Sequence, residues 1–259
     1  MKSFLSAFLA FCILCLTSCS KSTSDQTIRD EIKSPICVGD ISYDNDKSFG
    51  YHVYIEENGD FVPFLVLSSD YNGYCLLLRE YLFDSLMEYN YPGEYGSYYK
   101  DSNIDKYLNN VYYLNFSEKV RKLILNSNIK ITTKNAIDTH DKETEIISRK
   151  VFLLSASEIN DKMHYTYLDE GDKIAYFKDI KNRVALHENG ECDSWILRTP
   201  ALQGGNDLMA IGPVGSIGTG GINGMEGVNK ISVRPAFCIS SETKIIQKNI
   251  EGKNVFCIQ

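Results

Sequence analysis

The chain has 259 residues, of which 43% are hydrophobic, and it carries a formal net charge of −7 at pH 7. This acidic balance argues against nucleic acid as a partner and against binding to an anionic membrane through basic patches. The length and apolar content are sufficient for one sizeable core rather than two, so we expect a single domain over residues 35–259.

The first 18 residues have the features of a secretory signal peptide. One Lys precedes an apolar run over residues 4–16, which is too short to span a bilayer. The run ends in Leu16-Thr17-Ser18-Cys19, which resembles the bacterial lipobox. The resemblance implies cleavage before Cys19 and its acylation, which makes the lipid bilayer the first expected partner. The mature chain would then be an extracytoplasmic, membrane-anchored lipoprotein, without access to ATP or nicotinamide cofactors.

Residues 19–34 are polar and nearly free of large apolar side chains, which is typical of a flexible tether. Beyond the acylated residue, an odd number of cysteines remains in the mature chain: Cys37, Cys75, Cys192, Cys238 and Cys257. At least one of these thiols must be free, while one or two disulfides are possible. No pair has the C-x-x-C spacing of a zinc site.

The first part of the domain is predicted to be β-structure. Four segments are rich in β-branched and aromatic residues: 36–43, 51–55, 61–67 and 74–78. The dipeptides Asn58-Gly59 and Asn72-Gly73 separate the later runs. They favour tight hairpin turns because both residues tolerate positive φ.

Helical periodicity follows. Helices are predicted over residues 104–112 behind the capping box Ser102-x-x-Asp105, over residues 117–125, and in a short segment behind Ser155-x-x-Glu158. Strands are predicted at 129–133, 151–154 and 231–239, the last of them half-buried because its apolar residues alternate. Nine of the 18 glycines lie within residues 204–227, which indicates tight turns and long loops. Helices between two sets of strands predict an α+β fold.

Four segments, taken in order, resemble a bacterial family known as domain of unknown function 6273. They are Ile104-Asp105-Lys106-Tyr107-Leu108-Asn109, residues 151–155 with Glu158, Trp195-Ile196-Leu197-Arg198-Thr199-Pro200, and Val233-Arg234-Pro235-Ala236-Phe237. The resemblance extends over most of residues 35–240. The family usually has Ser in place of Thr199 and often has Trp in place of Ile196.

A Trp-x-x-Arg strand precedes a Val-Arg-Pro strand, with a glycine-rich region between them. This order is also similar to the formylglycine-generating-enzyme branch of the C-type lectin fold. This resemblance implies a twisted sheet flanked by two helices, adjacent chain ends and a binding face made of long loops. It does not extend to the activity, since those enzymes hold copper with a cysteine pair that Cys238 and Cys257 do not match in context.

Arg198 and Arg234 have two interpretations. They can form a pair of guanidiniums that binds a carboxylate or sulfate, or each can connect loops to the sheet through buried hydrogen bonds. We favour the structural role for both, together with Pro200 and Pro235. Trp195, the only Trp, is predicted to pack in the core.

Eleven of the seventeen tyrosines fall between Tyr71 and Tyr113. Around Pro92 and Gly93 they crowd a predicted loop, in which Tyr95, Tyr98 and Tyr99 are the candidate ligand-binding residues. Such rings can stack on sugars or dock a protein. A loop anchored to its own domain by these rings is an equally good interpretation.

The sequence shows no pattern for catalysis or metal binding. The segment from Asp44 to Ser48 lacks the glycine and glutamate of a calcium loop, the four histidines are scattered, and no G-x-S-x-G or phosphate-binding loop is present. We therefore expect no cofactor, no metal and no catalytic residue. The predicted function is binding of a glycan, a peptide or another surface protein, and the alternatives are an enzyme that modifies exported molecules or a structural envelope component.

Overall fold

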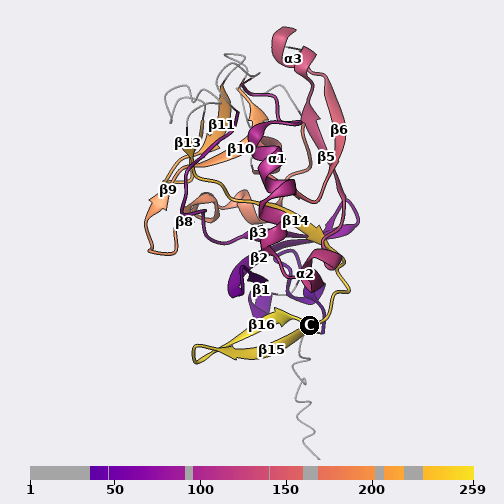
Figure 1. Cartoon of the computed structure of the whole chain (residues 1–259), viewed down its shortest axis with the longest axis vertical. Coiled ribbons are helices and arrows are strands. Elements are labelled where there is room, and N and C mark those ends of the chain that lie inside the picture. The colour runs from indigo at the N-terminus through magenta and orange to yellow at the C-terminus, as the bar shows by residue number, and fades with distance from the viewer. Residues whose placement is uncertain are drawn as a thin grey trace, which may run out of the picture. The chain divides into compact units, whose positions relative to one another are not determined.

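The computed structural model describes residues 36–45, 47–90, 96–139, 141–159, 169–201, 207–218 and 230–259 (Figure 1). The chain divides into two units, Met1–Ser34 and Pro35–Gln259, and every described residue belongs to the second. The predicted signal peptide, Cys19 and the tether therefore lie outside the described residues.

A seven-stranded mixed sheet forms the centre of this unit, in the order β15-β16-β1-β2-β3-β14-β7. Its strands are β1 (His52–Glu57), β2 (Asp60–Tyr71), β3 (Tyr74–Arg79), β7 (Val151–Phe152), β14 (Ala236–Ile239), β15 (Ile245–Ile250) and β16 (Lys253–Ile258). All neighbours are antiparallel except β1 and β16, which are parallel. The last strand of the chain thus lies beside the first.

The two Asn-Gly pairs form the predicted hairpin turns. Asn58 and Gly59 have φ of 55° and 91°, and Asn72 and Gly73 have φ of 53° and 86°. Glycine reaches this region freely and asparagine does so more easily than most residues. The turns therefore set the register of β1, β2 and β3.

The predicted helices are confirmed by α1 (Asn103–Asn110), α2 (Glu118–Leu123) and α4 (Ala156–Ile159). Ser102 caps α1 by accepting from the backbone N–H of Asp105 at 3.2 Å. Ser155 and Glu158 cap α4 reciprocally, each accepting the other's backbone N–H. A further helix, α3 (Lys134–Thr139), was not expected.

Four smaller sheets complete the described part of the fold. They pair β4 (Met87–Glu88) with β13 (Lys230–Ile231), β5 (Ser127–Thr132) with β6 (Thr144–Arg149), β8 (Ala185–Leu186) with β9 (Cys192–Asp193), and β10 (Trp195–Pro200) with β11 (Leu208–Ile211) and β12 (Ile217–Gly218). Short 3₁₀ helices lie at Val38–Ile41, Lys47–Phe49, Tyr112–Asn115, Ala175–Lys178 and Ile180–Arg183. The α+β class predicted from the sequence is confirmed.

Two expected strands differ from the structure. Residues 36–43 form a 3₁₀ helix rather than a strand, because the Asp40 carboxylate accepts the backbone N–H groups of Ile36 and Cys37 at 2.8 and 3.0 Å and turns the chain. Only the end of 231–239 belongs to the central sheet, as β14. Its residues are buried on both faces rather than one, because β14 lies between β3 and β7.

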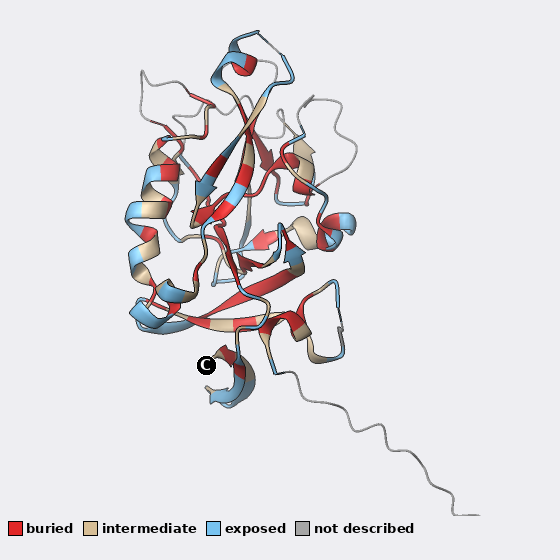
Figure 2. Cartoon of the chain, turned by 90° about the vertical axis from the view of Figure 1, so that its right-hand side faces the viewer, coloured by how far each residue is buried: buried red, intermediate tan, exposed pale blue. Residues whose placement is uncertain are grey.

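The core lies between the central sheet and the elements packed on it, and Figure 2 shows buried residues along the strands and the inner side of α1. Phe64, Phe116 and Phe237 meet there, with ring centroids 5.2 to 6.1 Å apart. All five cysteines of the domain are free. Within the described ranges, no helix combines the length and apolar character needed to cross a bilayer.

Candidate binding cleft

A cleft of about 600 Å³ opens beside helix α1. Its walls come from the β1–β2 turn, the end of β3, the loop that leads into β4, helix α1, the 3₁₀ helix Tyr112–Asn115 and one residue of β13. Asn58 lies in the turn, and its backbone N–H donates to the carbonyl oxygen of Asn115 at 2.7 Å. This bond holds the turn between β1 and β2 against the 3₁₀ helix Tyr112–Asn115.

Three side chains from separate elements meet in this cleft. Arg79 Nε donates to Glu57 Oε2 at 3.2 Å, and the Tyr112 hydroxyl donates to the same oxygen at 2.8 Å. The side chains of Glu57 and Arg79 are only 8% and 9% exposed. Burial, and then the negative charge of Glu57, raise the pKa of Tyr112 well above its ordinary value, so its hydroxyl remains a proton donor.

The other carboxylate oxygen of Glu57, Oε1, has no hydrogen-bond partner among the described residues. A carboxylate has room for about four hydrogen bonds. In the described part of the chain Oε1 is not one of the buried atoms that lack a partner, so it is open to the solvent of the cleft. Because Glu57 lines the cleft, a bound molecule or water can supply the missing donor.

Aromatic rings stand next to this group. Phe83 lies 4.8 Å from the ring of Tyr112 and 6.3 Å from that of Tyr107, centroid to centroid, and all three residues line the cleft. Phe83 and Tyr107 are only partly buried. The cleft thus combines flat apolar surfaces with polar residues, among them Asn58 and Asn115.

The Val-Arg-Pro segment supports the cleft from behind. The backbone N–H of Arg79 donates to the Pro235 carbonyl at 3.0 Å, and the backbone N–H of Phe83 donates to the Val233 carbonyl at 3.1 Å. In the other direction, the side-chain Nε of Arg234 donates to the Arg79 carbonyl at 2.9 Å. The residues of this segment therefore hold the backbone on which Arg79 and Phe83 stand.

Arg234 is buried with its guanidinium carbon 5.3 Å from the ring of Trp195. Burial lowers the pKa of Arg234 to about 10, and in the described part of the chain Nη1 has no partner. Trp195 is itself fully buried and donates from Nε1 to the Arg183 carbonyl at 2.9 Å. The two family segments meet here, because Trp195 forms a parallel bridge with Ser232.

Arg198 lies in a different, fully buried cluster. Its Nη1 and Nη2 donate to the two Glu158 oxygens at 2.9 and 2.8 Å, and the remaining donors reach the carbonyls of Lys130, Leu153 and Glu170. Burial alone would lower the pKa of Arg198, but the Glu158 carboxylate holds it above its ordinary value. All five N–H groups of this guanidinium are used, so Arg198 and Arg234 do not form a pair that binds one anion.

The carboxylates of this cluster are also satisfied. Glu158 accepts from Arg198, from the Tyr71 hydroxyl at 2.5 Å and from the Ser155 N–H at 2.7 Å. Glu170 accepts from the N–H and hydroxyl of Thr132 and from the Thr199 hydroxyl. Burial raises the pKa of Glu170 above its ordinary value. This cluster therefore offers a ligand no free group.

The three candidate tyrosines have different positions. Tyr95 lies outside the described residues. Tyr99 is 1% exposed, and its hydroxyl accepts the Leu153 N–H at 3.3 Å, so the expectation that its ring faces a ligand is wrong. Its apolar ring is instead buried beside Tyr89.

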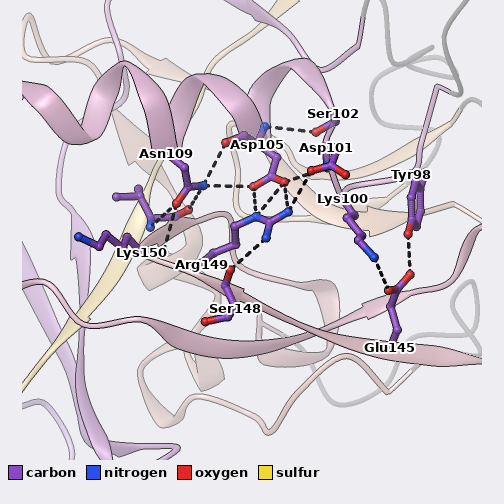
Figure 3. A network of polar contacts seen from close by, with 11 residues as sticks. Tyr98, Lys100, Asp101, Ser102, Asp105, Asn109, Glu145, Ser148, Arg149 and Lys150 are labelled. Atoms are coloured by element: carbon purple, nitrogen blue, oxygen red, sulfur yellow. Dashed lines mark hydrogen bonds and ion pairs between the residues drawn. The ribbon is translucent and has the colours of Figure 1, made fainter.

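Tyr98 is half-buried and belongs to the polar network in Figure 3. Its hydroxyl donates to Glu145 at 2.5 Å, and Lys100 donates to the same carboxylate at 3.1 Å. In the same view Arg149 forms a bidentate pair with Asp105 of α1. The network fastens strand β6 to the start of α1, which is the role expected for anchoring side chains.

Other sequence expectations concern Pro200 and metal binding. Pro200 is buried in β10 opposite Leu208. Within the described ranges, no three side chains of His, Cys, Asp or Glu are grouped so that they can hold a metal ion. The sequence did not predict Glu57, Arg79 or Phe83 as site residues. Tyr107 belongs to the family segment 104–109 and to the tyrosine-rich stretch that ends at Tyr113, and these were the signals toward the cleft.

The family model named Domain of unknown function (DUF6273) matches residues 72–241, which is more than half of the chain. The match includes Arg79, Tyr107 and Tyr112, whereas Glu57 lies before it. No curated protein and no solved structure matches the chain. The chain belongs to the DUF6273 family, as its four recognisable segments predicted.

Proposed function

We propose that the protein is a lipid-anchored, extracytoplasmic glycan-binding protein that uses the cleft formed by Glu57, Arg79, Tyr112, Phe83 and Tyr107. The observation that carries the proposal is Glu57, a side chain that is nine-tenths buried, lines an open cleft and has one carboxylate oxygen without a partner among the described residues. A preformed site with few oriented polar groups is the usual form of a small-ligand pocket.

Sugars fit this combination better than peptides do. A sugar ring has an apolar face, which packs on aromatic rings, and a rim of hydroxyls, which donate and accept hydrogen bonds. Phe83 and Tyr107 supply the rings, and Glu57 with the amides of Asn58 and Asn115 supplies the polar partners. The volume of about 600 Å³ lies within the range of ligand pockets.

We also propose that the domain has a C-type-lectin-like fold. Three features support it. The two ends of the domain lie close together, because Lys244 forms a bridge with Cys37 and its carbonyl accepts from the Gln259 N–H at 3.0 Å. The helices α1 and α2 lie beside the sheet (Figure 1), and the Trp195 and Arg234 segments are in contact. Superposition of an experimental structure on lectin-like domains would test this assignment.

The membrane anchor rests on the lipobox-like Leu16-Thr17-Ser18-Cys19. Replacing the acyl-accepting Cys19 with Ala is expected to move the protein from the detergent phase to the aqueous phase in a partitioning assay, since stable anchoring requires the acyl chains. Equal partitioning of Cys19→Ala and wild type would contradict the anchor.

Glycan binding is tested with the purified full chain on an array of bacterial and host oligosaccharides. Glu57→Gln should weaken the signal at least about tenfold, because the amide gives up a charged acceptor and loosens its contacts with Arg79 and Tyr112. Glu56→Gln is the matched control, because neighbouring residues of a strand point to opposite faces. Absence of any glycan signal with folded wild-type protein, or equal binding by both variants, would contradict the proposal.

A further inference from the structure

We propose that the cleft selects a neutral sugar and disfavours both acidic sugars and amino sugars. This inference rests on the proposed glycan-binding function and adds the chemical class of the ligand. It is argued from the way in which the charges of the cleft are already paired.

The carboxylate of Glu57 favours a ligand that donates a hydrogen bond. Among the described residues Oε2 accepts from Arg79 and Tyr112, whereas Oε1 is open to a donor from the cleft. A sugar hydroxyl donates, whereas a ligand carboxylate or sulfate has no proton to give. It would place a second negative oxygen beside Glu57, a repulsive contact that works against acidic ligands.

Arg79 is not free to offset this repulsion. Nε donates to Glu57, and Nη1 donates to the carbonyls of Tyr81 and Leu82 at 2.7 and 3.0 Å. Its Nη2 lies 3.6 Å from the carboxylate of Glu188. A guanidinium fixed on several sides cannot turn to form the bidentate contact by which Arg usually binds a ligand carboxylate.

The second argument concerns cations. The Glu57 charge is already balanced by Arg79 at 3.2 Å. A ligand ammonium donating to Oε1 would share that single carboxylate with the guanidinium, so that two cations would compete for one anion. A neutral hydroxyl meets the same hydrogen-bond requirement without this repulsion.

The rim repeats the pattern. Glu88 of β4 and Lys230 of β13 are register partners on neighbouring strands, which places opposite charges side by side. Both line the cleft, and the exposed Asp84 is the remaining charged residue of its lining. The lining therefore holds three carboxylates and two cations, a net charge of −1 that works against an acidic sugar, whereas the exclusion of amino sugars rests on the Glu57–Arg79 pair alone.

The experiment uses matched sets of small probes: the methyl glycosides of glucose, galactose and mannose, each with the corresponding uronate and 2-amino sugar. Binding to the full chain is measured by calorimetry and saturation-transfer NMR at pH 7. In each set that shows binding, the neutral member is expected to bind at least about tenfold more tightly than its uronate and more tightly than its amino counterpart. A set in which the uronate or the amino sugar binds as tightly as the neutral member, or more tightly, would overturn the inference.

Glu57→Gln provides a second readout. The substitution should lower the affinity for the neutral sugar. It should also reduce the preference for the neutral sugar over the uronate, because the repelling carboxylate is gone. An unchanged preference in a folded variant would overturn the inference. If the variant does not fold, the wild-type sets decide alone. A charged sugar that binds tightly and competes with array glycans would overturn the preference for neutral sugars but leave the proposed glycan binding intact. If no probe and no array glycan binds, both the preference and the proposed function are contradicted.

Discussion

Two buried Arg–Glu pairs in this domain differ in what they leave unused. Arg198 and Glu158 use every donor and acceptor within the protein, and both side chains are fully buried. Arg79 and Glu57 are nearly as buried, but within the described ranges one Glu57 oxygen has no partner, and the residue lines a cleft. The first pair connects α4 and β10, whereas the second is available to a ligand.

The comparison shows that burial and charge alone do not identify a binding site. The two pairs differ in how many hydrogen bonds the carboxylate lacks and in whether a cleft reaches it. If this is correct, substitutions in the first pair should affect stability and substitutions beside the second should affect binding.

Arg198→Met should have the largest effect. Removing the guanidinium leaves Glu158 buried without a counterion, which is expected to lower the free energy of unfolding by about 3 to 5 kcal/mol. Urea unfolding at pH 7 measures the change, with Arg121→Met on the surface of α2 as the control. A loss below about 1 kcal/mol would contradict the structural role of this pair.

Tyr107→Ala should act mainly on binding. The ring is partly buried at the cleft wall, so its loss is expected to weaken glycan binding by about 1 to 2 kcal/mol, a larger effect than its cost in stability. Calorimetry with the best array glycan measures the affinity. Val111→Ala, an exposed residue just after α1, is the control and should bind as the wild type does. Equal affinities of the two variants would place the ligand elsewhere.

Tyr112→Phe should have an intermediate effect. The change removes one donor from Glu57 Oε2 without removing the ring, which should lower the free energy of unfolding by about 1 kcal/mol and weaken binding about threefold by loosening the carboxylate. Thermal unfolding and calorimetry on the same sample report both quantities. Tighter binding in the variant would show that the hydroxyl does not position Glu57.

Tyr98→Phe should have the smallest effect and should leave binding unchanged. Partial burial alone would raise the pKa of Glu145, but hydrogen bonds from Tyr98 and Lys100 outweigh it and hold that pKa below its ordinary value. This stabilisation is present at neutral pH and is lost as the pH falls through the lowered pKa. The variant should therefore lose about 1 kcal/mol or less at pH 7, and this loss should shrink as the pH falls through the lowered pKa of Glu145. Weakened glycan binding would instead favour the Tyr-rich segment as the ligand site.

Local signals in the sequence predicted much of the fold. The Asn-Gly turns set the β1–β2–β3 hairpins, and the capping boxes at Ser102 and Ser155 marked two helix starts, because these features act within a few residues. The 3₁₀ helix at Val38–Ile41 was missed because its β-branched residues resemble a strand, while Asp40 turns the chain. The parallel pairing of β1 with β16 depends on residues far apart in the sequence.

The candidate site was harder to predict for the same reason. Glu57 ends a strand before an Asn-Gly turn and therefore resembles a solvated hairpin end. Its partners Arg79 and Tyr112 lie 22 and 55 residues further along the chain, so that only the folded sheet brings them together. Tyrosine enrichment covers the part of the chain that contains Tyr107 and Tyr112, but the loop around Pro92 and Gly93 resembles a binding site more than a tyrosine on α1 does.

The most direct test of the proposal that this cleft binds glycans is a crystal structure of the protein with the neutral oligosaccharide that binds best on the array. We predict a sugar ring packed against Tyr107, with one of its hydroxyls donating to Glu57 Oε1. A sugar bound elsewhere, with Glu57 Oε1 still lacking a ligand donor, would contradict the account.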